Sequence, residues 1–226
     1  MSDFLRRSFI EDFGIPADRL VTVHCGPNIP VPELDHGMEV SLMARRRSCS
    51  WDAISSAKGA LQLLEAFADV RARVPDARLV MVGGGRMAQQ MEPRPGVEFV
   101  GFLSRDTEAG RRRMDSAYRG AHVFCIPTRF EPFGTSFVEA MMYGLPCVGP
   151  AAWAVPEIID DGITGLLTPP GDHGGLVQAL TRLLQDRTEA RRMGDAARTR
   201  ALERFAWTSL MQRMSAGLAS VVAAAT

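Results

Sequence analysis

Short apolar runs alternate along the chain with longer stretches in which apolar residues recur every three or four positions. Runs bounded by Gly, Pro, Asn or Asp are typical of buried strands, and the longer period is typical of amphipathic helices. The runs predict strands at residues 20–24, 38–44, 77–85, 97–102, 122–127 and 145–150. The longer period predicts helices at residues 2–13, 57–74, 107–120, 135–144, 156–160, 173–186, 188–204 and 207–223.

This alternation of strands and helices predicts an α/β fold. Strands joined through helices favour parallel βαβ units with right-handed crossovers, and parallel sheets are covered by helices on both faces. We therefore expect a single Rossmann-like open parallel sheet with helices on both faces. Ligands of such sheets bind beyond the carboxyl ends of the strands, so the loops that follow strands should carry the site.

Composition and charge narrow the class of protein. With 226 residues, of which 46% are apolar, the chain can build the core of a single domain. Its formal net charge is zero, which argues against a general nucleic-acid binder. The 26 basic residues comprise 25 arginines and a single lysine, and this imbalance draws attention to Lys58.

Three further features bear on the compartment. The four cysteines form no C-x-x-C pair, which favours free thiols in a reducing compartment. The first residues are charged and lack the apolar core of a signal peptide, and no apolar run reaches the ~18–20 residues of a membrane span. We expect a soluble cytoplasmic protein, either free or peripheral to the inner face of the membrane.

The segment from residue 122 to residue 150 carries the densest set of candidate site residues. A predicted strand leads to Glu131, and Gly134 lets a helix begin where its free amides can meet a phosphate. Thr135 and Glu139 share one face of that helix, and the two carboxylates could accept the paired hydroxyls of a sugar. The alternative is structural, because many strand–turn–helix units contain a glycine and acidic residues.

The spacing of the two glutamates favours the functional interpretation. Glu131-x7-Glu139, with Pro-Phe-Gly after the first and Gly-Leu-Pro after the second, resembles the E-x7-E signature of the group 1 family (family 4) of retaining glycosyltransferases, which have the GT-B fold. The segments KGALQLLEAF, PDARLVMVGGG, VEFVGF and VPEIIDDGITGLLTPPGD are also similar to family segments and stand in the same order. The resemblance spans roughly residues 20–205 and implies the C-terminal, donor-binding half of a GT-B fold.

The resemblance also implies roles for individual residues. Glu131 would hydrogen-bond the hydroxyls of the donor sugar, and Glu139 would hold the ribose. Lys58, in the family's Lys-Gly position, would neutralise the diphosphate as the glycosidic bond breaks. Glu131 and Lys58 are thus the candidate catalytic residues. Backbone contacts to the sugar and the distal phosphate would come from Phe133, Gly134 and Thr135.

Two residues at other predicted strand ends complete the expected donor site. Gly84 belongs to a triple glycine that is not a G-x-G-x-x-G motif, and we interpret it as a tight turn that lets the ligand approach the backbone. Phe102 ends the strand that resembles the family's strand beside the nucleobase. Trp153 and Ala154 stand where the family often carries two glycines, so their bulk either narrows the sugar pocket or serves packing.

The sequence departs from the family pattern at one cation. The family usually has an arginine five residues before the lysine, and this chain has Ala53 there. Arg45, Arg46 and Arg47 are the candidates for the missing charge, with Arg45 preferred because it follows the strand predicted at 38–44. The alternative is a solvated cluster of charges.

The resemblance suggests a division of the chain. Residues 1–37 would be the remnant of an interdomain linker, 38–205 the nucleotide-sugar-binding domain, and 206–226 a C-terminal helix that packs toward an N-terminal domain. That domain holds the acceptor in the family, and we expect it to be missing from this sequence.

The function implied is transfer of a hexose from a UDP- or GDP-sugar to a glycan, lipid or small-molecule acceptor, with retention. No metal or other cofactor is expected, because no D-x-D element stands at a predicted strand end. No nucleic-acid partner is expected either. Two alternatives stay open, a non-catalytic nucleotide-sugar-binding module and a subunit that works with a separate acceptor-domain chain. The match around the two glutamates argues against a phosphorylase or an epimerase.

Overall fold

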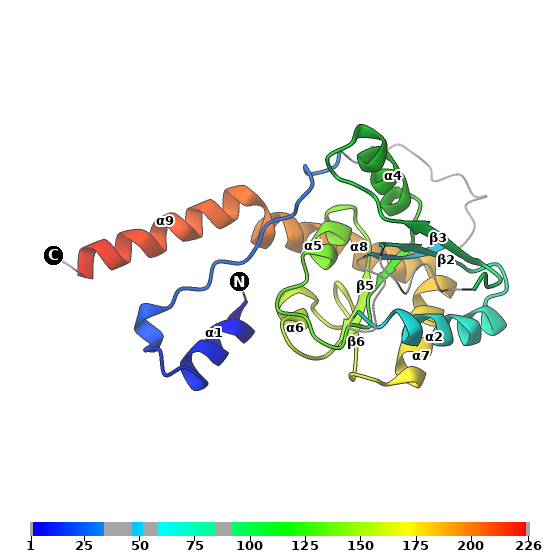
Figure 1. Cartoon of the computed structure of the whole chain (residues 1–226), viewed down its shortest axis with the longest axis horizontal. Helices are drawn as coiled ribbons and strands as arrows, with labels where there is room; N and C mark the ends of the chain where they lie inside the picture. Colours follow the sequence, from blue (N-terminus) through cyan, green and yellow to red (C-terminus); the bar gives the residue numbers. More distant parts are fainter. Residues whose placement is uncertain (1, 34–46, 52–57, 85–91, 225–226) are drawn as a thin grey trace.

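The computed structural model describes residues 2–33, 47–51, 58–84 and 92–224. Within them, six parallel strands form one sheet in the order β3-β2-β1-β4-β5-β6, and helices cover both of its faces (Figure 1). The predicted fold class, an open parallel α/β sheet, is therefore confirmed. The strands are β1 Arg47–Trp51, β2 Arg78–Val82, β3 Val97–Gly101, β4 Val123–Cys125, β5 Cys147–Pro150 and β6 Gly165–Thr168.

The helices lie close to the predicted ranges. Several begin at a side-chain cap: Thr107, Asp172 and Asp186 accept hydrogen bonds from backbone N–H groups in the first turns of α4, α7 and α8. The helical elements are α1 Asp3–Glu11, the 3-10 helix η1 Ala17–Arg19, α2 Ala60–Arg73, α4 Glu108–Arg119, α5 Thr135–Met142, α6 Val155–Ile158, α7 His173–Gln185, α8 Arg187–Phe205 and α9 Trp207–Ala224.

The strand predictions need three corrections. First, β1 forms from a polar segment for which no strand was predicted; the strand predicted at 38–44 lies outside the described residues. Pairing with β2 on one side and β4 on the other compensates for the poor strand propensity of that segment. The structure also adds β6, whose short run Gly-Leu-Leu-Thr pairs with β5 over its whole length. Residues 20–24 form no strand with any described segment.

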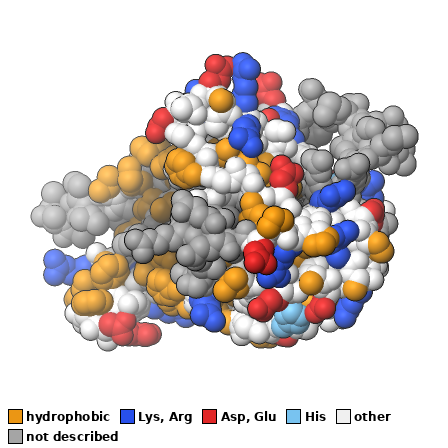
Figure 2. All heavy atoms as spheres, turned by 45° about the vertical axis from the view of Figure 1, so that its right-hand side comes forward, with side chains coloured by type: hydrophobic (Ala, Val, Ile, Leu, Met, Phe, Trp, Pro, Cys, Tyr) orange, Lys and Arg blue, Asp and Glu red, His pale blue; other side chains and the backbone are white. Residues whose placement is uncertain are grey.

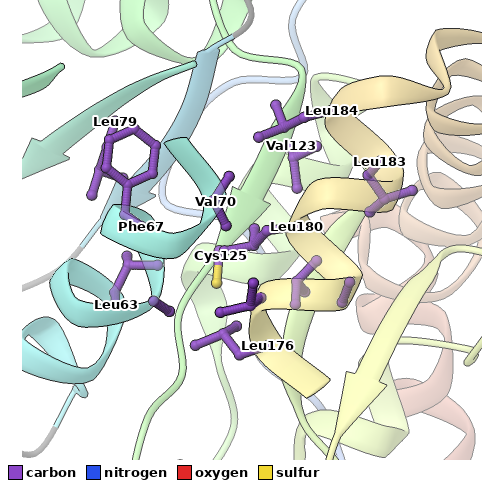
Figure 3. Packing of buried hydrophobic residues seen from close by; sticks show 14 of the residues in the cluster. Leu63, Phe67, Val70, Leu79, Val123, Cys125, Leu176, Leu180, Leu183 and Leu184 are labelled. Carbon is purple, nitrogen blue, oxygen red and sulfur yellow. The ribbon is translucent and has the colours of Figure 1, made fainter. Parts of the chain in front are cut away.

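Alternate residues of the central strands face two different hydrophobic layers. In β2, Leu79 and Met81 belong to the layer under α2 and α7, whereas Val80 and Val82 belong to the layer under α4, α5 and α8. This follows from the period of two along a strand. Figure 3 shows the first layer, in which side chains of α2 and α7 meet across β4; its labelled residues are Leu63, Phe67, Val70, Leu79, Val123, Cys125, Leu176, Leu180, Leu183 and Leu184.

The first helix and the last helix lie to one side of the sheet (Figure 1). The backbone N–H groups of Asp3 and Phe4 donate to the carboxylate of Glu157 at 2.8 and 2.7 Å, which fixes the start of α1. The indole N–H of Trp207 donates to the carbonyl of Pro27 at 3.0 Å, which fixes the start of α9. No helix in the described part of the chain is long and apolar enough to cross a membrane.

Charged side chains of both signs are intermingled on the face shown in Figure 2. On α4, Arg112 pairs with Glu108 at 2.5 Å and Arg119 pairs with Asp115 at 2.8 Å, each one helical turn apart. Exposed pairs of this kind contribute only about 0.2–1 kcal/mol each to stability. We interpret Arg112 and its partner as part of the solvated surface.

Candidate functional site

The strand order reverses direction between β1 and β4. The chain moves outward from β1 through β2 to β3, then returns to β4 beside β1 and continues to β6. In open parallel sheets, a ligand-binding crevice lies at the carboxyl edge at such a reversal, which here falls between β1 and β4. Lys58 follows β1 and Glu131 follows β4, so both predicted catalytic residues lie at this reversal.

Lys58 and Glu131 form an ion pair. The Lys58 Nζ donates to Glu131 Oε2 at 2.7 Å, with the lysine side chain 24% exposed and the glutamate side chain 7% exposed. The close approach depends on Gly59, which has a left-handed φ of 73°. A Cβ at Gly59 would come within 1.9 Å of the Pro127 carbonyl oxygen at the end of β4. The Lys-Gly sequence thus lets the start of α2 rest on β4 and brings the lysine to the glutamate.

The N-terminus of α5 lies close to Glu131, because a Cβ at Gly134 would be 3.3 Å from the Glu131 Cγ. Gly134 precedes the helix with a left-handed φ of 104°, and no side chain of the described residues caps it. The first amides of an α-helix have no intrahelical acceptor and lie at the positive end of the helix dipole. The amides of Thr135 and Ser136 are therefore candidates to bind an anion near Glu131, the ion-pair partner of Lys58. A Cβ at Gly134 would contact Phe137 at 2.9 Å, so glycine is also required for packing.

Glu139 lies one turn further along α5 and is fully buried. Arg105 donates to both of its oxygens, from Nη1 to Oε1 at 2.6 Å and from Nη2 to Oε2 at 2.9 Å. The Tyr118 hydroxyl donates to Oε2 at 3.1 Å, and the Asn28 backbone N–H donates to Oε1 at 3.1 Å. The sequence did not identify these partners, because Arg105 follows β3 without any motif and Asn28 lies in the segment before the sheet.

Gly84 and Phe102 meet at the ends of β2 and β3. A Cβ at Gly84 would lie 3.0 Å from the Phe102 Cβ, so the glycine allows the two loops to touch. The Phe102 side chain is 78% exposed, which is unusual for a large aromatic residue at a strand end. The structure therefore brings together these two predicted donor-site residues, and the Phe102 residue stays exposed.

The side chains around the Glu131 loop serve packing. Phe133 is buried, with its ring centroid 5.6 Å from that of His24 and 5.9 Å from that of Phe205, so its side chain packs in the core. Trp153 has a left-handed φ of 57°, which explains why a glycine suits this position in the family. Its ring makes an edge contact with Phe130 at 6.4 Å, consistent with a packing role.

The missing phosphate cation is not located by the structure. Arg45 and Arg46 lie outside the described residues. Arg47 is the first residue of β1 and pairs with Arg78, so it lies at the amino edge of the sheet, opposite to the crevice.

One group of possible metal ligands occurs in the described residues, at Asp3, His24 and Glu157. Its atoms already have partners: Glu157 accepts two N–H groups of α1 and contacts His24 Nε2 at 3.2 Å, and Asp3 accepts from the Thr22 hydroxyl. Burial lowers the pKa of His24, although the neighbouring Glu157 opposes this shift. We interpret the group as the attachment of α1 to the domain.

Comparison with known proteins places the chain in a family. Residues 44–200 match the family model of the group 1 glycosyl transferases. The chain belongs to this family. Its structural neighbours are glycosyltransferases of the GT-B fold, in agreement with the resemblance of the E-x7-E segment.

Three members and neighbours illustrate the relation. The chain is 34% identical over 156 residues to a sulfoquinovosyl transferase of Arabidopsis thaliana, covering 66% of this chain and 29% of that protein. It is 35% identical over 153 residues to a phosphatidyl-myo-inositol mannosyltransferase of Mycobacterium leprae, covering 67% of this chain and 40% of that protein. The structure of Anabaena HepE with UDP-glucose has the same fold, with a TM-score of 0.78 at 20% identity over 97% of this chain and 62% of that one. This chain therefore spans less than two thirds of the length of each of these proteins.

Proposed function

We propose that this chain binds the donor, a UDP- or GDP-sugar, for the retaining transfer of a hexose to an acceptor. The observation that carries the proposal is the ion pair between Lys58 and Glu131 at 2.7 Å beside the uncapped start of α5. In a nucleotide sugar the distal phosphate and the sugar share one oxygen atom. A cation that binds the phosphate and a hydrogen-bond acceptor for the sugar hydroxyls must therefore be neighbours, as Lys58 and Glu131 are.

Each part of the donor has a matching group. The diphosphate lies against Lys58 and the free amides of α5, which supply positive charge without reorganisation. Glu131 accepts hydrogen bonds from the sugar hydroxyls, and Glu139 accepts those of the ribose. The exposed ring of Phe102 stacks on the base beside Gly84.

Charge development on the leaving group explains why these residues promote transfer. The acceptor oxygen bonds to the anomeric carbon while the bond from that carbon to the distal phosphate oxygen breaks. The electron pair leaves with the nucleoside diphosphate, and the acceptor proton passes to a phosphate oxygen. Lys58 and the α5 amides stabilise the negative charge that grows there, without a metal ion. Retention requires the new bond to form on the face from which the diphosphate leaves.

The acceptor is held by a surface other than this crevice. We propose that an acceptor-binding domain, in the same polypeptide or in a separate chain, closes over the donor and excludes water. The family relation supports this arrangement, because the transferases similar to this chain are much longer than the matched part. The acceptor is a glycan, a lipid or a small molecule.

Calorimetric titration tests the donor site directly. The purified chain should bind UDP or GDP in the presence of EDTA, and Lys58→Ala should weaken that binding. Arg112→Ala is the matched control, because it removes one positive charge from an exposed pair on α4. Failure of every nucleoside diphosphate to bind would refute the proposed function. Binding that requires Mg²⁺ or Mn²⁺ would refute its metal-free form.

A further inference from the structure

The carboxylate of Glu139 has no acceptor position left for a ribose. A carboxylate offers about four lone-pair sites on its two oxygens. In the described residues, Oε1 accepts from Asn28 N–H and Arg105 Nη1, and Oε2 accepts from Arg105 Nη2 and the Tyr118 hydroxyl. The side chain of Glu139 is also fully buried. A ribose diol can therefore hydrogen-bond to these oxygens only after one of the present hydrogen-bond donors has moved away.

We propose that Arg105 is a latch on the nucleotide site, which the two ribose hydroxyls displace from Glu139 when a ribonucleotide binds. The proposal rests on the proposed function, since it assigns the ribose to Glu139. It adds a residue that sets both the affinity and the sugar specificity of the site. Arg105 lowers the affinity most for ribonucleotides, whose diol must displace it from Glu139, and least for nucleotides without the diol.

Of the hydrogen-bond donors to Glu139, Arg105 is the one that can move away. The Tyr118 ring is fully buried and stacked on Tyr143 with 4.7 Å between ring centroids, so it is held in the core. The Asn28 donor is a backbone group and cannot rotate away. The Arg105 side chain is 38% exposed and projects from the loop between β3 and α4. Because the guanidinium is already partly in water, breaking its ion pair with Glu139 costs less free energy than breaking a fully buried pair.

The geometry of the latch also explains why a diol is the matching ligand. The guanidinium occupies both oxygens of Glu139 with two parallel N–H donors. Two adjacent hydroxyls can replace both bonds, whereas a deoxyribose can replace one at most. Displacement by a sugar without the diol would leave a buried carboxylate oxygen short of a donor, which is costly.

The test compares ribonucleotides with dideoxyribonucleotides by calorimetry. The probes are UDP, GDP and their 2′,3′-dideoxy forms, and the proteins are the wild-type chain, Arg105→Met, Arg105→Lys and the control Arg112→Met. Arg105→Met keeps an unbranched apolar stem and removes the competing donors. It should bind the ribonucleotide about tenfold more tightly than the wild type, the gain expected from losing a charge-assisted competitor. The dideoxy forms should gain much less, Arg105→Lys should be intermediate, and Arg112→Met should match the wild type.

Other results would overturn the latch. Unchanged or weaker ribonucleotide binding by Arg105→Met would show that Arg105 does not compete with the ribose. An equal gain for both kinds of nucleotide would show that Arg105 blocks the site without reference to the diol. In both cases the wild type still binds nucleotide, so the proposed function survives. If the wild type and all variants fail to bind any of the probes, the proposed function itself fails and the latch fails with it.

Discussion

Lys58 Nζ and Glu131 Oε2 lie 2.7 Å apart although the two residues are 73 positions apart in the sequence. The pair joins the loop after β1 to the loop after β4, the two strands between which the sheet reverses direction. The lysine is therefore already held at the crevice before a donor binds. Such preorganisation reduces the free energy spent on arranging the charge during reaction.

Replacement of Lys58 should affect phosphate recognition alone. Lys58→Met keeps most of the apolar stem, and we expect it to weaken UDP or GDP by about 1–3 kcal/mol, the range for a lost hydrogen bond to a charged group. Binding of the nucleoside without phosphates should stay unchanged. Titration calorimetry with uridine and UDP, or guanosine and GDP, measures both. An equal loss for nucleoside and diphosphate would contradict the phosphate assignment.

The two glutamates should differ in the ligand that they affect. Glu139→Gln replaces one ribose acceptor by a donor and should weaken free UDP or GDP by about 1–3 kcal/mol. Glu131→Gln should leave the free nucleoside diphosphate nearly unchanged and weaken only the intact nucleotide sugar. Competition binding with both ligands distinguishes the variants. If both variants weaken both ligands equally, the division of roles is wrong.

Gly59 should be far less tolerant of a side chain than Gly14. Both have left-handed φ angles, of 73° and 66°, so alanine costs about 1–2 kcal/mol at either position. A Cβ at Gly59 would also meet the Pro127 carbonyl at 1.9 Å, whereas a Cβ at Gly14 has no heavy atom within 4 Å among the described residues. Gly59→Ala should therefore lower the free energy of unfolding by about 1–3 kcal/mol more than Gly14→Ala. Urea denaturation of the two variants checks this, and equal losses would contradict the close contact.

Stability should fall as the pH decreases because of His24. Burial lowers the pKa of His24 below its ordinary value, while Glu157 and Asp3 oppose the shift and Arg213 adds to it. Between the folded and the unfolded pKa, the unfolded chain binds more protons, so protonation favours unfolding. This contribution is fully present above the unfolded pKa, near 6.5, and is lost as the pH falls through it toward the folded pKa.

The variant His24→Gln should show a flatter decrease in the free energy of unfolding between about pH 7 and pH 5, where histidine titrates. His173→Gln, which removes an exposed histidine at the start of α7, controls for the loss of any histidine. Denaturant titrations at a series of pH values give both slopes. An unchanged slope in His24→Gln would show that His24 does not cause the decrease.

The sequence predicted the fold where the period of apolar residues was clear. The helix ranges and four of the six strands within the described residues agree with the structure, because each has a continuous apolar run or a full amphipathic repeat. It failed at β1, where an Arg- and Ser-containing segment becomes a central strand through its neighbours on both sides. Pairing in a sheet is a long-range effect that no local period reports.

For the candidate site, the sequence indicated several residues but none of the contacts between them. The E-x7-E spacing identified Glu131 and Glu139, and the single lysine identified Lys58. The ion pair of Arg105 with Glu139 joins residues of different loops, and no spacing along the chain indicates it. The prediction for Arg45 stays untested, since that residue lies outside the described part of the chain.

The hydrogen bond from the Asn28 backbone N–H to Glu139 Oε1 connects the nucleotide crevice to the segment between α1 and the sheet. Asn28 and Arg105 donate to the same oxygen atom, so each weakens the hydrogen bond of the other. When a neutral ribose hydroxyl replaces the charged guanidinium, the competing hydrogen bond to Oε1 becomes weaker, and the bond from Asn28 N–H to Oε1 shortens. The amide resonance of Asn28 should then move downfield, which makes one backbone proton in the connecting segment a spectroscopic sensor of what occupies the carboxylate.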